Sequence, residues 1–113
     1  MYKRGTIVLV PFPFTDLTGA KVRPALIIST SLPGDDVVVL FISSKRVAIG
    51  KFDVLVEPTK QNGLKITSVI KSSKIATLDK KMILGELGSL ESKTMSQVAK
   101  KLRLILLCGA VVV

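Results

Sequence analysis

Short runs of β-branched and other apolar residues follow one another along most of the chain, and no helical pattern separates them. Four runs, at residues 6–12, 22–29, 37–42 and 52–56, are each bounded by Pro, Gly, Asp or Ser, and a weaker alternating run covers residues 68–75. Because consecutive strands without crossover helices pair antiparallel, this pattern predicts a mainly β chain whose meander closes into a small barrel. Pro24, near the start of the second run, is expected at an edge or first position of a strand, since it cannot donate to a central ladder.

The end of the chain carries the one convincing helical pattern. In SKTMSQVAKKLRLILL, residues 92–107, apolar side chains recur at helical spacing, with Ser92 as the expected N-cap and Gly109 as the expected stop. We expect this stripe to pack on the barrel, because only one such helix is available to cover the core. The stripe consists of Met95, Val98, Ala99, Leu102, Ile105 and Leu106.

The balance of charges predicts a polyanionic partner. The 113 residues, a length typical of one domain (1–113), carry 17 Lys and Arg against 8 Asp and Glu, a net charge of +9. Such an excess favours nucleic acid, an acidic lipid surface or an acidic protein, although a surface that is merely soluble and basic is the alternative. Two of the expected loops, 43–51 and 57–67, are rich in Lys and Arg and could form a basic groove at one rim of the barrel.

The expected location is the cytoplasm. Cys108 is the single cysteine, which excludes an internal disulfide, and its apolar neighbours favour a structural thiol over a nucleophile. The basic N-terminus lacks the uninterrupted apolar segment and cleavage site of a signal peptide. The apolar run at 104–113 is too short to span a bilayer as a helix, so no membrane partner is predicted.

The absence of histidine removes several catalytic chemistries. It excludes His-based triads, His-bearing zinc sites and the paired-histidine route to RNA cleavage, and a single cysteine cannot assemble a zinc site. Asp35 and Asp36 are adjacent on an expected turn, where their side chains diverge, and no Walker-type phosphate loop is present. We therefore predict no metal and no cofactor. The remaining Arg, Lys, Ser and Thr suit contact with phosphate, and cleavage of RNA by its own 2′-hydroxyl needs neither a protein nucleophile nor a metal.

The segment GTIVLVPFPFTDLTGAKVRPALIIS, residues 5–29, strongly resembles the opening of the MazF/PemK family of toxin endoribonucleases. FISSK (41–45), NGLKITSVIKSSKIATLDK (62–80) and LGELGSL (84–90) are similar to later segments of the family, more loosely. The resemblance implies an SH3-like (CcdB/PemK-type) barrel with a C-terminal helix that works as a homodimer. It also implies metal-independent cleavage of single-stranded RNA, usually messenger RNA at short sequences, and an acidic antitoxin whose disordered segment covers the RNA groove.

The resemblance also implies site residues. The family's catalytic arginine maps onto Arg23, which we expect to stabilise the charged transition state, because a protonated guanidinium is a poor general base; the competing interpretation is that Arg23 pairs with a carboxylate such as Asp16. The family's strand-end hydroxyl maps onto Ser43, which is expected to donate to a phosphate oxygen, unless it only satisfies the backbone at the strand end. The expected RNA-binding residues are Lys21, Ser44, Lys45, Arg46, Lys71 and Lys74.

Two positions depart from the family pattern. Thr67 stands where relatives often have an acidic residue, and Ala76 stands where the family has an arginine, while Lys71 and Lys74 add positive charge. Two other functions remain open. A CcdB-like gyrase-inhibiting toxin would act through its terminal helix and would not need an arginine beside a hydroxyl. A nucleic-acid-binding barrel without catalysis would explain the charge equally well.

Overall fold

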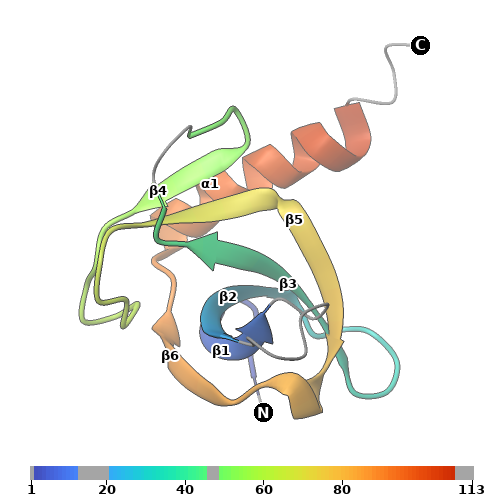
Figure 1. Ribbon diagram of the computed structural model, residues 1–113. Helices are drawn as coiled ribbons and strands as arrows, with labels where there is room; N and C mark the ends of the chain where they lie inside the picture. The colour runs from blue at the N-terminus through green and yellow to red at the C-terminus, as the bar shows by residue number, and fades with distance from the viewer. Residues whose placement is uncertain (1, 13–20, 46–48, 109–113) are drawn as a thin grey trace.

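Six antiparallel strands and one C-terminal helix make up the protein, as the computed structural model shows for residues 2–12, 21–45 and 49–108 (Figure 1). The strands form one sheet in the order β4-β5-β3-β2-β1-β6. Their bounds are Thr6–Phe12 (β1), Lys21–Ser29 (β2), Asp36–Ser43 (β3), Asp53–Val56 (β4), Ser68–Asp79 (β5) and Gly85–Ser89 (β6). A 3₁₀ turn, Lys80–Met82, joins β5 to β6, and α1 (Ser92–Arg103) continues into a π-helical turn, Leu104–Cys108. The predicted mainly β fold with a terminal helix is confirmed.

The path of the chain through the sheet differs from the predicted meander. β1, β2 and β3 are sequential neighbours, but β5 lies between β3 and β4, since its residues 69–71 pair with β3 on one side and with β4 on the other. The sheet curls strongly (Figure 1), yet its ladders leave β4 and β6 as edges, so the fold is a curled half-barrel and not a closed one. The sequence pattern missed β6 because GELGS offers no apolar alternation.

Pro24 lies in a central strand, contrary to the expectation of an edge or first position. It is the fourth residue of β2, which has β1 on one side and β3 on the other. Pro24 pairs with Leu9 of β1, whereas the ladder with β3 begins only at Ala25. The missing N–H of proline is tolerated because the β2–β3 ladder has ended at that point.

The two faces of the sheet bury separate apolar clusters. One cluster includes Ile7, Leu26 and Leu40 and packs against α1, where Val98 is fully buried. The other includes Val8 and Val39 and is covered by residues next to the 3₁₀ turn. Along β1, successive residues therefore enter opposite clusters, as the two-residue period of a strand requires.

The helical stripe is only partly core. Met95 and Leu102 pack with Val98 against the first cluster, but Ala99 and Leu106 are exposed. Glu91, and not Ser92, occupies the N-cap, and Gly109 lies outside the described residues. Among the helices of the described residues, none is long and apolar enough to cross a membrane.

The loop between β4 and β5 is fastened to the start of α1 by a buried asparagine. Asn62, which is fully buried, accepts hydrogen bonds from the N–H groups of Thr59 and Leu64 at 3.0 Å each. Its amide donates to the carbonyl of Glu57 at 2.9 Å and to Glu91 Oε1 at 3.4 Å, and the Thr59 hydroxyl donates to Glu91 Oε2. The hydrogen bond from Thr59, helped by that from Asn62, outweighs burial and lowers the pKa of Glu91.

Glu91→Gln is expected to lower the free energy of unfolding at pH 7 by about 1 kcal/mol, because the replaced carboxylate accepts two side-chain hydrogen bonds. The lowered pKa in the folded protein means that the unfolded chain binds more protons in acid. The contribution of Glu91 is therefore present above about pH 4.3, the ordinary value for glutamate, and is lost as the pH falls through the folded-state pKa. Urea unfolding should show a smaller difference in the free energy of unfolding between wild type and variant at pH 3 than at pH 7. An equal difference at both pH values would contradict this assignment, and Glu86→Gln, at an exposed position of β6, is the control.

Candidate nucleic-acid interface

A cavity of about 480 Å³ opens between β2, β3 and β5 on the face of the second cluster. Its volume lies within the range typical of ligand sites. Half of its lining residues are cationic, and three others form an apolar wall that includes an aromatic ring. The lining consists of Arg23, Phe41, Ile42, Ser43, Lys45, Lys71, Lys74 and Ile75.

The cavity begins where the β2–β3 ladder ends. The last pair of that ladder joins Ala25 to Phe41, and extending the register by two residues would place Arg23 opposite Ser43. Pro24 lies between Arg23 and Ala25 on β2 and has no N–H to donate to a ladder, so β2 and β3 are free to separate here. The residues that a longer ladder would pair instead line the cavity.

A bulge in β5 shapes the opposite wall. The β3–β5 ladder joins Leu40 to Ile75 and then Phe41 to Lys71, so residues 72–74 of β5 have no partner on β3. β5 bends visibly along its length (Figure 1), as bulges cause strands to do. Lys71 and Lys74, at the two ends of this bulge, both line the cavity.

Arg23 is half-buried and has no ion pair or hydrogen bond to another described residue. The carboxylate proposed as its competing partner, Asp16, lies outside the described residues. Ser43 accepts a hydrogen bond from the N–H of Lys45 at 3.1 Å, so the hydroxyl does satisfy the backbone at the strand end. A hydroxyl that accepts still has its own proton to donate, and Ser43 can therefore also serve a ligand in the cavity.

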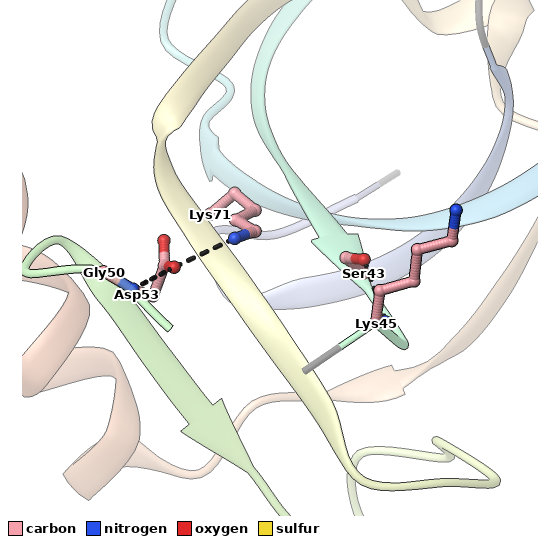
Figure 2. A network of polar contacts seen from close by, with 5 residues as sticks. All are labelled: Ser43, Lys45, Gly50, Asp53 and Lys71. Carbon is pink, nitrogen blue, oxygen red and sulfur yellow. Dashed lines mark hydrogen bonds and ion pairs between the residues drawn. The ribbon is translucent and has the colours of Figure 1, made fainter. Parts of the chain in front are cut away.

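Lys71 is already paired. Its Nζ lies 2.9 Å from Asp53 Oδ2, and the same oxygen accepts the N–H of Gly50 at 2.7 Å (Figure 2). Burial of the Asp53 carboxylate acts to raise its pKa, but the Gly50 N–H and the Lys71 ammonium together outweigh burial, so the pKa lies below its ordinary value. Asp53 is therefore ionised at neutral pH and forms a true ion pair with Lys71.

The structure brings most of the predicted site residues together. Arg23, Ser43, Lys45, Lys71 and Lys74 share the cavity, although they come from β2, β3, β5 and the segment that follows β3. Lys21 and Ser44 are exposed and do not line the cavity, and Arg46 lies outside the described residues.

Sequence reasoning missed Asp53 and the apolar wall of the cavity. Phe41 and Ile75 read as ordinary strand residues, and nothing local marked the cross-strand partner of Lys71. Ala76, where the resemblance led us to expect an arginine, pairs with Val39 and packs against the second cluster. Within the described ranges, no three His, Cys, Asp or Glu residues are grouped so as to hold a metal ion.

Comparison with known proteins identifies the family. The profile described as PemK-like, MazF-like toxin of type II toxin-antitoxin system matches residues 3–106. The chain belongs to this family. It is thus a toxin of a type II toxin-antitoxin system, of MazF/PemK type. No curated protein sequence matches this toxin.

Solved structures share the fold of this toxin. An endoribonuclease in complex with its cognate antitoxin, from Mycobacterial species, is 26% identical, with 91% of this chain and 92% of that chain covered and a TM-score of 0.70. The toxin MazF-mt6 of Mycobacterium tuberculosis is 22% identical over 87% and 92% of the two chains, with a TM-score of 0.67. A MazE–MazF structure from Deinococcus radiodurans is 19% identical over 93% and 95%, with a TM-score of 0.74.

Proposed function

We propose that this toxin is an endoribonuclease that cleaves single-stranded RNA in the cavity between β2, β3 and β5 without a metal ion. The observation that carries the proposal is the placement of Arg23, unpaired among the described residues, with Ser43 on a cavity that three lysines also line. The structurally similar mycobacterial protein is itself named an endoribonuclease.

The reaction that suits this lining uses the RNA's own nucleophile. The 2′-hydroxyl oxygen attacks the adjacent phosphorus while its proton leaves to a base, and the bond from phosphorus to the 5′-oxygen breaks as that oxygen gains a proton. The products are a 2′,3′-cyclic phosphate and a free 5′-hydroxyl. The transition state concentrates negative charge on the phosphoryl oxygens, so fixed positive charge beside them lowers the barrier.

Each lining residue has a role consistent with its chemistry. The guanidinium of Arg23 offers planar donors to the phosphoryl oxygens, and the Ser43 hydroxyl offers one further donor. The described lining holds no histidine and no carboxylate, so its contribution is charge and hydrogen bonding more than proton abstraction. Lys45 and Lys74, both exposed, would draw the RNA backbone toward the cavity.

The proposed partners follow from the same surface. An acidic, disordered segment of an antitoxin would carry negative charge into the cationic cavity and exclude RNA from it. The mycobacterial structure is of an endoribonuclease in complex with its cognate antitoxin, and the Deinococcus structure is of MazE–MazF. We infer that the active toxin is a homodimer, as the family resemblance implies, and that it acts in the cytoplasm, where messenger RNA is found.

Purified toxin incubated with single-stranded RNA in excess EDTA is expected to give discrete fragments that end in cyclic phosphate. EDTA removes free divalent cations, so cleavage in its presence requires a metal-free route. Intact RNA accompanied by inhibited gyrase would favour a CcdB-like poison, and RNA that is bound but intact would favour a non-catalytic binding barrel.

Arg23→Lys is expected to reduce the cleavage rate at saturating RNA by about 100-fold, because an ammonium cannot reproduce the planar donors at the transition state. RNA affinity should change by less than about 3-fold, since the positive charge is kept. Single-turnover rates and binding to 2′-O-methyl RNA, which cannot be cleaved, measure the two quantities separately. Arg103→Lys, at the exposed end of α1, is the matched control. Equal losses of rate and affinity would show that Arg23 only docks the phosphate.

Ser43→Ala and Ser44→Ala form a second matched pair, because the two serines are adjacent and only Ser43 lines the cavity. Ser43→Ala is expected to slow cleavage by about 10-fold through loss of one donor, and Ser44→Ala should retain the wild-type rate. Single-turnover cleavage of one RNA substrate compares them. Equal rates in the two variants would remove Ser43 from the mechanism.

A further inference from the structure

Asp53, Lys71 and Phe41 are consecutive partners across three strands. Asp53 of β4 pairs with Lys71 of β5, and Lys71 pairs in turn with Phe41 of β3. Directly opposed residues project from the same face of a sheet, and β5 lies between β4 and β3, so Asp53 and Phe41 flank Lys71 from opposite sides of β5. Lys71 and Phe41 line the cavity, whereas Asp53 does not.

Of the two charged groups in this ion pair, the Asp53 carboxylate is the more firmly held. The Asp53 side chain is only 8% exposed and is held by the Gly50 N–H at 2.7 Å, while the Lys71 side chain is 27% exposed. Figure 2 shows Asp53 joined to both partners. A lysine ammonium has three donors, and the hydrogen bond to Asp53 leaves two of them for a ligand. Lys71 thus enters the cavity with its position set and most of its hydrogen-bonding capacity unused.

We propose that Asp53 is a positioning residue for RNA binding, which holds the Lys71 ammonium at the cavity wall so that it meets an RNA phosphate without having to be ordered first. This inference rests on the proposed function of the cavity as the RNA site. A lysine side chain has large rotamer freedom, and a free lysine loses that freedom when it binds. The ion pair removes most of this loss before RNA arrives, which is a gain from preorganisation.

For the replacement of Asp53, the proposal and simple electrostatics predict opposite changes in RNA affinity. If Asp53 only contributes negative charge near a polyanion, then its replacement by a neutral residue should tighten RNA binding. If Asp53 positions Lys71, the same replacement frees the lysine and weakens binding. Lys71→Met should also weaken binding, and the two changes together should cost little more than Lys71→Met alone, because both act through one ammonium.

The test is a double-mutant cycle of Asp53→Asn and Lys71→Met, with affinity measured by titration of a fluorescent 2′-O-methyl RNA at several salt concentrations. We expect Asp53→Asn to weaken binding by about 5-fold and Lys71→Met by about 10-fold. In Lys71→Met the dependence of log affinity on log salt should fall by about 0.7, the value for one phosphate contact of a single strand, whereas in Asp53→Asn it should stay near the wild-type value because the freed lysine keeps its charge. A purely structural role for Asp53 would weaken binding as much in the Lys71→Met background as in the wild type.

Asp35→Asn is the matched control, because Asp35 is an exposed carboxylate before β3, at the opposite end of that strand from Ser43. It makes the same change in net charge and should bind RNA at least as tightly as wild type. Binding by Asp53→Asn that equals Asp35→Asn would overturn the proposal. If Asp53→Asn does not fold, the Lys71→Met variant provides an independent test: an RNA affinity equal to that of the wild type would overturn the proposal.

The outcomes separate this inference from the proposed function. An affinity deficit in Asp53→Asn, found with a protein that cuts no RNA in EDTA, would leave the positioning role standing and refute cleavage. Normal affinity in Asp53→Asn, found with a protein that does cut RNA, would refute positioning alone. A wild-type protein that binds no RNA would refute both.

Discussion

The antiparallel ladder between β3 and β5 shifts register between Leu40 and Phe41, and the cavity exists because of that shift. Three residues of β5 are left without partners on β3, the strand bends, and lysines at both ends of the bulge are brought to one opening. The bulge also buries Ser72, whose Oγ has no hydrogen-bond partner in the described part of the chain. A buried unpaired hydroxyl costs stability, and such costs are typically tolerated where the local geometry serves a site.

Arg23 and Lys71, two of the cationic residues that line the cavity, are held in different ways. Among the described residues, Arg23 has no ion pair, whereas Lys71 is held by a carboxylate that is itself held by the backbone of Gly50. The first arrangement leaves a guanidinium free for a developing negative charge, and the second fixes an ammonium in place. A net charge of +9 draws a polyanion toward the whole molecule, but this local arrangement decides where along the surface the phosphate can be gripped.

Much of the fold could be predicted from sequence because the signals are local. β1 has the predicted bounds, and the observed bounds of β2 to β5 differ from the predicted ones by a few residues at most. The terminal helix lies where the apolar period predicted it. β6 was missed because two glycines and a glutamate give no strand period. The place of β5 between β3 and β4 was missed because strand order depends on contacts between distant segments.

By itself, the sequence determined the extended segments, the terminal helix, the absence of histidine, and the presence of Arg23 and Ser43 in segments that resemble a toxin family. Only the tertiary structure decided that these two residues share a cavity with Lys71 and Lys74, and that Asp53 is the partner of Lys71. The physical reason is register: a shift of one residue in either ladder of β5 would turn these side chains to the opposite face of the sheet, and residues far apart in the chain carry no local signal of which register they adopt.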